Sequence, residues 1–165
     1  MSDMKWNDQA EKALAVLNKG AFLTTAHDGK TNTMTISWGS LGFVWRRPIF
    51  TVLVRPSRHT FGIIEKSGEF TVTIPLEDMQ QALALCGSKS GRDLDKFAAA
   101  GIKTLPGRTG NTPVIDCAGF HYECRVIYKQ AMNPANADAE VDATCYATGD
   151  HHVMYYGEIV AVYSK

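Results

Sequence analysis

The chain has 165 residues, 45% of them hydrophobic and 21% charged, and its 17 lysines and arginines balance 17 aspartates and glutamates. A balanced composition of this kind is typical of a globular domain and lacks the basic surface that general nucleic-acid binding needs. No apolar run reaches the roughly 18 residues of a membrane span, and the N-terminal segment is polar. We therefore expect one cytoplasmic domain over residues 1–165, with no membrane span and no nucleic-acid partner.

The first third of the chain predicts a helix followed by strands. Apolar residues recur at helical spacing over about residues 9–18. The Asp28-Gly29 pair is typical of a tight hairpin turn. Glycines and Pro48 within residues 39–48 predict a loop. Around these features, apolar and β-branched runs predict three strands, namely Ala21–Ala26, Thr31–Trp38 and Ile49–Val54.

Helices and strands follow one another irregularly in the rest of the chain. Helices are predicted at about 56–66, 77–85 and 94–100, with a polar loop at 130–138 and a short helix to about Tyr146. Strands are predicted at 69–74, 112–116, 120–129 and 153–163. Because regular strand–helix–strand alternation is missing, the pattern disfavours a doubly wound parallel sheet. We expect a mainly β fold with helical additions, arranged as an antiparallel barrel.

A first candidate binding segment follows the third predicted strand, with the sequence Arg55-Pro56-Ser57-Arg58-His59-Thr60. The start of a helix presents free N–H groups and the positive end of the helix dipole, which together favour phosphate. Arginines add charge-assisted hydrogen bonds, and the serine and threonine add hydroxyl donors. A capped helix with a solvated basic end explains the same residues equally well.

A second candidate segment runs Cys86-Gly87-Ser88-Lys89-Ser90-Gly91-Arg92, with Lys96 one helical turn further on. Its glycines, serines and cations suit a loop that wraps an anion with backbone N–H groups. A polar connection between two helices is the alternative. Taken together, the two segments favour one phosphate held between them.

The predicted strand that ends in Trp38 is a third candidate. Alternate residues on a strand face opposite sides, so Thr33, Thr35 and Ser37 share one face. The other face carries Met34, Ile36 and Trp38, after Asn32. A flat aromatic cofactor binds well against a strand edge with apolar side chains beside it. An ordinary barrel strand has the same pattern.

The fourth candidate is Gly149-Asp150-His151-His152, just before the last predicted strand. Adjacent strand residues point in opposite directions, so the two imidazoles chelate poorly and we expect no metal. His151 is either structural or a contact for a charged ligand or a proton route. The four cysteines form no Cys-x-x-Cys pair and are expected to be free thiols. With no nucleophile–base pair evident, a bound organic cofactor is the better source of chemistry.

Several segments, in one collinear order over about residues 20–163, resemble the flavin reductase-like family with the FMN-binding split-barrel fold. Within that family the chain is most similar to flavoredoxins and NAD(P)H:flavin oxidoreductases. The segments that carry the resemblance are Asn32–Gly39, Val54–Thr60, Cys86–Phe97, Gly149–His151 and Tyr156–Val160.

The resemblance implies a homodimer with FMN near the subunit interface. It implies that the isoalloxazine ring lies along Asn32, Met34, Thr35, Ile36, Ser37 and Trp38. It assigns the phosphate and ribityl chain to Arg55, Ser57, Arg58, Thr60, Cys86, Gly87, Ser88, Ser90 and Lys96. The Gly149–His151 segment matches a motif linked to reduced-nicotinamide binding, which makes His151 a candidate nicotinamide contact.

The function expected on this basis is hydride transfer from NADH or NADPH to FMN, with onward delivery of electrons and no obligatory acid or base among the side chains. One alternative is a flavoredoxin-type electron-transfer protein that a protein partner reduces. Others are a non-redox module that holds flavin or another flat ligand such as haem, and a structural dimer without a ligand. The final electron acceptor, the choice between NADH and NADPH, and whether FMN stays bound all remain open.

Overall fold

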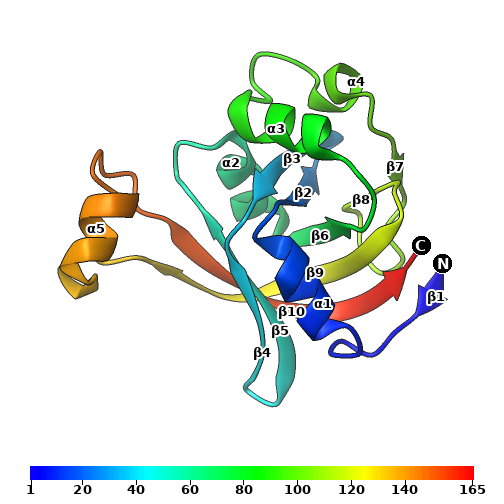
Figure 1. Cartoon of the computed structure of the whole chain (residues 1–165), viewed down its shortest axis with the longest axis horizontal. Coiled ribbons are helices and arrows are strands. Elements are labelled where there is room, and N and C mark those ends of the chain that lie inside the picture. Colours follow the sequence, from blue (N-terminus) through cyan, green and yellow to red (C-terminus); the bar gives the residue numbers. More distant parts are fainter.

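The computed structural model describes all residues from Met1 to Lys165 and consists of a curved antiparallel sheet with helices packed around it (Figure 1). The hydrogen-bonded strand order is β3-β2-β6-β9-β10-β5-β4, and β1 (Ser2–Asp3) pairs with β10. The other strands are β2 (Ala21–His27), β3 (Lys30–Ile36), β4 (Gly39–Val44), β5 (Arg47–Val54), β6 (Glu69–Pro75), β9 (Gly119–Ala131) and β10 (Val153–Ser164). The expectation of a mainly β, antiparallel fold with helices is confirmed.

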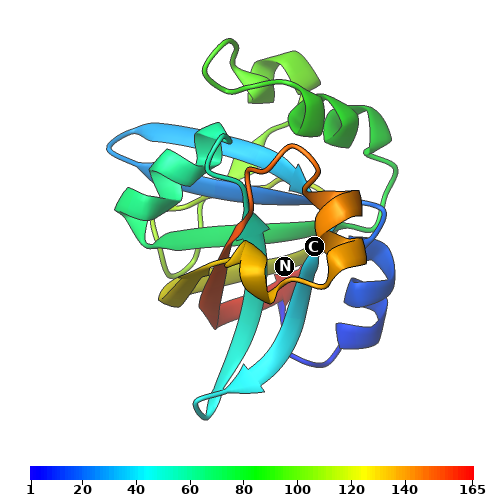
Figure 2. The same ribbon diagram turned by 90° about the vertical axis from the view of Figure 1, so that its left-hand side faces the viewer.

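The helices occupy two regions outside the sheet. Figure 2 shows α3 and α4 together on one side of the molecule, while α5 lies on an arm that connects β9 to β10. None of the helices combines the length and the apolar character needed to cross a membrane. Their bounds are α1 (Ala10–Leu17), α2 (His59–Ser67), α3 (Gln80–Ser88), α4 (Lys96–Ala100) and α5 (Ala139–Cys145), with a 3-10 turn η1 (Pro134–Asn136) on the same arm as α5.

Two apolar clusters hold these elements in place. The larger one fills the curve of the sheet and contains Phe50, Tyr122 and Tyr155. The smaller one packs α3 against the sheet through Phe22 and Cys86, both of which are essentially inaccessible to solvent. Burial of these side chains supplies most of the driving force for folding. The smaller cluster also brings the C-terminal end of α3 next to β3, which positions the candidate site.

The loop predicted for residues 39–48 is wrong, because this segment forms the hairpin of β4 and β5. Its turn consists of Trp45 and Arg46, whose φ angles of 53° and 59° are both left-handed. Such two-residue turns usually contain Asn-Gly or Asp-Gly. Neither pair is present here, and Gly39 and Gly42 lower the apparent strand propensity, so the sequence signals concealed the hairpin.

Two predicted segments also change their boundaries. The α3 helix continues to Ser88, so the first residues of the second candidate segment are helical rather than a loop. The strand predicted at 112–116 is reduced to β8 (Val114–Ile115), which pairs with the unpredicted β7 (Thr104–Leu105) apart from the main sheet. These short strands lack the alternating pattern on which strand prediction depends.

The starts of α2 and α4 also lie later than the sequence indicates. Before α2, the N–H of Arg58 donates to Arg55 O at 3.0 Å, which closes a turn before the helix begins at His59. Before α4, the Asp95 carboxylate accepts the N–H groups of Phe97 and Ala98, so this side chain caps the helix. Both binding segments therefore combine an irregular turn with a helix end.

Candidate functional site

Two adjoining pockets lie at the edge of β3. The strand-edge pocket has a volume of about 260 Å³ and is lined by Met34, Thr35, Ile36, Ser37, Trp38, Leu53, Arg55, Arg58 and His152. The cationic pocket has a volume of about 120 Å³ and is lined by Asn32, Met34, Ser57, Arg58, His59, Thr60, Cys86, Ser88, Lys89, Ser90, Gly91, Arg92 and Lys96. Met34 and Arg58 line both, so the two pockets share a wall.

The strand-edge pocket takes its shape from an unpaired strand. β3 pairs only with β2, and Thr33 O points to the free edge, where it accepts a hydrogen bond from Lys96 Nζ at 3.0 Å. Backbone direction repeats every second residue along a strand, so the N–H group of Thr35 faces the same edge. Ser37 follows one residue beyond the end of β3 and lines the same pocket. Trp38 stays 47% exposed beside them, whereas Ile36 is buried. The pocket thus combines a free backbone donor with an apolar wall.

Lys96 is a buried cation in the lining of the cationic pocket. Its Nζ donates to Thr33 O and, at 2.7 Å, to Cys86 O, and only 5% of the residue is exposed. Burial lowers the pKa of this ammonium, the neighbouring Cys86 raises it, and Arg58 lowers it. Two of its three hydrogens tie β3 to the end of α3. The third has no hydrogen-bond partner within the chain, and Lys96 lines the cationic pocket.

Asn32 and Gly91 form a close contact in the wall of the cationic pocket. Asn32 Nδ2 donates to Thr60 Oγ1 at 2.8 Å, and both residues are buried. A Cβ atom on Gly91 would overlap the Asn32 side-chain oxygen. This position therefore requires glycine, because any side chain would displace the amide that joins β3 to α2.

The charge of the cationic pocket is uniformly positive. Its lining contains Arg58, Lys89, Arg92 and Lys96 and no aspartate or glutamate. Burial lowers the pKa of His59, and the nearby Arg92 and Lys96 lower it further because they disfavour a second positive charge. Hydroxyls and cations around one small volume suit an anion with several oxygen acceptors.

The two candidate segments are also joined directly. Arg92 Nη1 donates to Ser57 O at 3.0 Å, and Arg58 Nη1 lies 3.4 Å from Gly87 O. Gly87 lines neither pocket, but a Cβ atom there would crowd Thr35. The structure therefore brings together the segments that the sequence analysis paired around one anion.

Arg55 occupies a different place from the one its segment suggests. Its guanidinium donates to Cys145 O at 2.8 Å, Asp150 O at 3.1 Å and Gly149 O at 3.3 Å. It also stands 5.1 Å from the centre of the Tyr146 ring. Arg55 thus lies in the wall of the strand-edge pocket and holds the arm against the body, and it does not line the cationic pocket.

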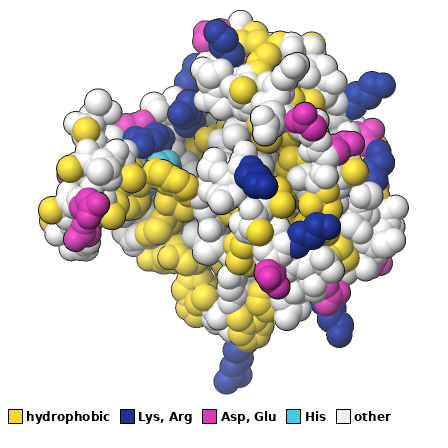
Figure 3. All heavy atoms as spheres, viewed as in Figure 1, with side chains coloured by type: hydrophobic (Ala, Val, Ile, Leu, Met, Phe, Trp, Pro, Cys, Tyr) yellow, Lys and Arg dark blue, Asp and Glu magenta, His cyan; other side chains and the backbone are white.

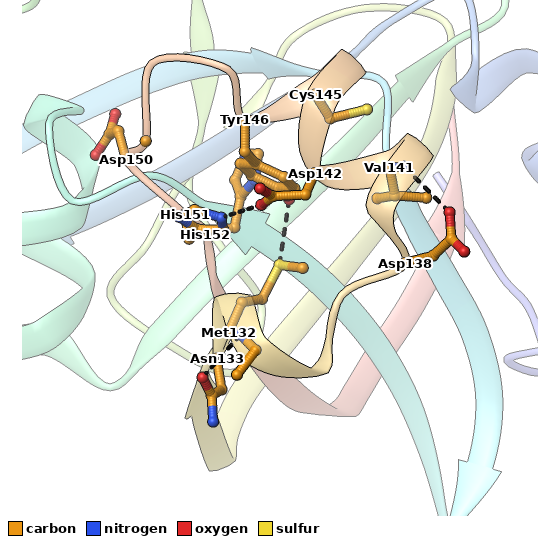
Figure 4. Close-up of polar contacts among 12 residues, drawn as sticks. Met132, Asn133, Asp138, Val141, Asp142, Cys145, Tyr146, Asp150, His151 and His152 are labelled. Atoms are coloured by element: carbon orange, nitrogen blue, oxygen red, sulfur yellow. Dashed lines mark hydrogen bonds and ion pairs between the residues drawn. The ribbon is translucent and has the colours of Figure 1, made fainter.

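The two consecutive histidines have different surroundings (Figure 4). His151 Nε2 pairs with Asp142 Oδ1 at 2.7 Å and its ring stacks on Tyr146, so it lies outside both pockets. His152 lines the strand-edge pocket, 5.4 Å from the Trp38 ring between centroids. Burial and the adjacent Arg55 lower its pKa to about 4. His152, which was not among the predicted site residues, therefore lines a pocket, while His151 as a nicotinamide contact stays a prediction.

Several residues that line the two pockets were not among the site residues predicted from the sequence. Leu53 gave no signal, since it resembles any apolar residue of a strand. The other omitted residues belong to the two candidate segments, beside residues that were predicted to bind. They are His59, Lys89, Gly91 and Arg92. In Figure 3 a histidine is visible beside hydrophobic and basic side chains where the arm joins the body.

Comparison with known proteins gives a consistent result. The family model described as "Flavin reductase like domain" matches residues 16–165. A flavoredoxin from Methanosarcina acetivorans superposes with a TM-score of 0.70 at 26% identity, covering 88% of this chain and 68% of that chain. An FMN-binding protein from Thermus thermophilus, solved with p-hydroxybenzaldehyde, has a TM-score of 0.70 at 24% identity over 88% of this chain and 71% of that one, a likeness of fold.

Curated relatives are longer than this chain. The uncharacterized protein YddH of Escherichia coli is 31% identical over 121 residues, which are 70% of this chain and 63% of that protein. A protein from Archaeoglobus fulgidus is 26% identical over 133 residues, or 81% of this chain and 65% of its own length. The matches thus extend over slightly less than two thirds of each relative.

Proposed function

This chain belongs to the family of the flavin reductase like domain, and from that premise we propose that it binds FMN across the two pockets and reduces it with NADH or NADPH. The supporting observation is that Met34 and Arg58 line both pockets. FMN consists of a flat ring system joined by a short chain to a phosphate. A strand edge with an apolar wall suits the ring, and the adjoining cationic pocket suits the phosphate.

The residues present fit this cofactor. The cationic pocket offers hydroxyl, ammonium and guanidinium donors with no carboxylate among them. Gly91 leaves the space that the Asn32 amide needs, so the pocket wall is built by a specific close approach. The remaining hydrogen of Lys96 and the guanidinium of Arg58 are the donors that we assign to the phosphate. The N–H groups of Thr35 and Ser37 are those assigned to the ring.

In this proposal the side chains bind and orient, and none is an obligatory acid or base. When bound, FMN would accept a hydride from the reduced nicotinamide and deliver the electrons onward. Trp38 would cover part of the ring and restrict access of water. His152, whose pKa lies at about 4, stays uncharged at neutral pH and limits the positive charge near the ring to that of the arginines.

The finer fold assignment, a split barrel that forms a homodimer, is part of the proposal. The β4–β5 hairpin exposes 61% of Phe43 and 55% of Trp45. Trp45 packs edge-on against Tyr128 and Tyr156, with ring centroids 5.6 and 5.9 Å away. Exposed aromatic patches of this kind mark protein contact surfaces. We assign the patch formed by Trp45, Tyr128 and Tyr156, here called the hairpin patch, to a second copy of the chain.

The test is the absorption spectrum of the purified chain, followed by titration with FMN and anaerobic mixing with NADH or NADPH. The proposal expects flavin binding and bleaching of the flavin band by at least one of the two nucleotides. Arg58→Ala should weaken FMN binding, whereas the matched change Arg46→Ala at the hairpin tip should not. A chain that binds no FMN at any concentration overturns the proposal.

The likeness to flavoredoxins supports a second candidate, an electron-transfer flavoprotein that a protein partner reduces. It shares the cofactor and both pockets with the first candidate. One result distinguishes the two candidate functions. Tight FMN binding without bleaching by NADH or NADPH favours electron transfer between proteins. Binding without any reduction by nucleotide or by a reducing protein leaves a flavin-holding module.

A further inference from the structure

A hydrogen bond joins two buried side chains beside the strand-edge pocket, and one of them, His152, lines that pocket. Tyr146 Oη lies 2.8 Å from His152 Nδ1, and the two residues expose only 4% and 8% of their surface. We propose that Tyr146 is a positioning residue that fixes the tautomer of His152, so that the imidazole presents an Nε2–H donor to the strand-edge pocket. The inference rests on the proposed function for the identity of the ligand, but not for the tautomer.

The direction of this hydrogen bond follows from the available acceptors. Burial raises the pKa of Tyr146, so the phenol keeps its proton at neutral pH. Its oxygen lies 3.2 Å from Met132 Sδ, which can only accept, and 2.8 Å from His152 Nδ1, which accepts when the ring proton is on Nε2 and donates when it is on Nδ1. A thioether sulfur is a weak acceptor, whereas an imidazole nitrogen is a good one. The stronger acceptor favours the arrangement in which the phenol donates to Nδ1 and the neutral imidazole carries its own proton on Nε2, and this is the arrangement that we assign.

The other ring nitrogen of His152 is accessible, and the residue lines the strand-edge pocket. Nε2 of His152 has no hydrogen-bond partner within the chain. The buried side-chain atoms without a partner are His121 Nε2 and Tyr122 Oη, and His152 Nε2 is not one of them. It is therefore accessible. Since His152 lines the strand-edge pocket, an accessible Nε2–H there offers a hydrogen bond to a ligand.

The surroundings keep the imidazole neutral. Burial is the main cause of its low pKa, and Arg55, Arg58 and His151 act in the same direction, while the Asp150 carboxylate acts against them. A neutral donor pairs with a carbonyl or carboxamide oxygen without adding charge. The pocket is thus expected to prefer such an acceptor at this point over a group that carries only donors.

Tyr146 is itself held rigidly. Its ring stacks on His151 at 4.5 Å with an angle of 15° between the planes, and His151 pairs with Asp142 of α5 (Figure 4). The guanidinium of Arg55 stands over the same ring. These contacts fix the phenol through its ring, so removing the hydroxyl alone leaves the packing in place.

The test is a nitrogen-detected NMR spectrum of the chain labelled with ¹⁵N-histidine, recorded near pH 7 without flavin. His152→Gln identifies the resonances. We expect the wild-type His152 to carry its proton on Nε2. In Tyr146→Phe both tautomers should be populated and the pKa of His152 should rise towards 6.5, because a hydrogen bond to the neutral form is lost. Tyr128→Phe, which loses a hydroxyl paired with Gln130 elsewhere, is the matched control.

A wild-type His152 protonated on Nδ1 overturns the inference, as does a Tyr146→Phe spectrum that matches the wild type. The wild-type measurement needs no variant, so an unstable Tyr146→Phe protein does not prevent a decision. FMN titration of the same samples is a separate result, because a failure to bind FMN contradicts the proposed function and leaves the tautomer measurement intact.

Discussion

Ser57 and Asp150, 93 residues apart, meet where the cationic pocket adjoins the α5 arm, with Ser57 Oγ donating to Asp150 Oδ2 at 2.5 Å. The Ser57 N–H also points at this carboxylate, 3.3 Å from Oδ1. Asp150 has a left-handed φ of 58°, and Arg55 holds its carbonyl. A protein carboxylate therefore occupies donors that a bound phosphate would also use.

Asp150→Asn should strengthen FMN binding by about 2- to 5-fold at low salt, which corresponds to removing one nearby exposed negative charge. Asparagine tolerates a left-handed φ and retains a side-chain acceptor for Ser57, so the turn should persist. Fluorescence titration of FMN measures the effect, and added salt should reduce it. Asp8→Asn, far from both pockets, is the control, and weaker binding by Asp150→Asn would contradict the competition.

Gly91→Ala should reduce FMN affinity at least tenfold while the chain stays folded. The added methyl group would overlap the Asn32 side chain and break its hydrogen bond to Thr60, which costs on the order of 1–3 kcal/mol for buried groups. Isothermal titration with FMN provides the affinity, and circular dichroism reports the fold.

Gly62→Ala is the matched control for that change. Gly62 lies inside α2, and a Cβ atom there meets open space. Alanine is a better helix former than glycine, so this variant should gain roughly 0.5–1 kcal/mol of stability and keep its affinity for FMN. Equal affinities for Gly91→Ala and Gly62→Ala would show that the Asn32 contact does not shape a phosphate site.

The sequence predicted the antiparallel sheet well because most strands have long apolar or alternating runs, such as Ile49–Val54. It failed at β4, whose turn of Trp45 and Arg46 adopts left-handed angles without glycine or asparagine. A tertiary constraint explains this failure, since β4 is held by its pairing with β5 rather than by its own propensity.

The candidate site was predictable by segment and less so by residue. Clusters of cations, hydroxyls and glycines identify the two segments around one anion. Orientation does not follow from such clusters. Arg55 contacts the carbonyls of the arm, and His152 rather than His151 lines a pocket.

Arg58→Ala and Lys96→Met should separate binding from stability. Lys96 is buried and bonded to two carbonyl oxygens, so its loss leaves both without a partner and should cost about 1–3 kcal/mol as well as FMN affinity. Arg58 is exposed, so Arg58→Ala should lose affinity with unfolding free energy changed by less than about 0.5 kcal/mol. Urea unfolding and FMN titration of both variants measure the two effects. Unchanged FMN affinity in both variants would remove the phosphate assignment.

Trp45→Ser should convert a dimer to a monomer. The indole is 55% exposed in the hairpin patch, and serine retains the polar surface without the aromatic contact area. Light scattering after size exclusion, over a range of concentrations, reports the mass. Leu76→Ser, which removes an exposed apolar side chain just after β6, outside the hairpin, tests whether the effect belongs to Trp45. A wild-type chain that is monomeric at every concentration contradicts the assignment of the patch.

Stability should fall as the pH is lowered from about 7 to 5. Burial lowers the pKa of both His121 and His152 to about 4, whereas an unfolded histidine titrates near 6.5. Between these values the unfolded chain binds more protons than the folded one, so the free energy of unfolding rises with pH across this window. Glu65, Glu123 and Glu158 have lowered pKa values and lose their contribution only at lower pH, below about 4.5.

Urea unfolding at pH 7.5 and pH 5 should therefore show a loss on the order of 2–4 kcal/mol, and His59, whose pKa is also lowered, adds in the same direction. His121→Gln and His152→Gln should each remove part of this difference, although each variant is less stable at pH 7.5. Replacing His121 also removes its contact with Thr73 Oγ1 at 3.2 Å, which lowers stability at both pH values. The quantity to compare is therefore the change in unfolding free energy between pH 7.5 and pH 5. Stability that stays level or increases on acidification to pH 5 would show that these two histidines are not held neutral by burial.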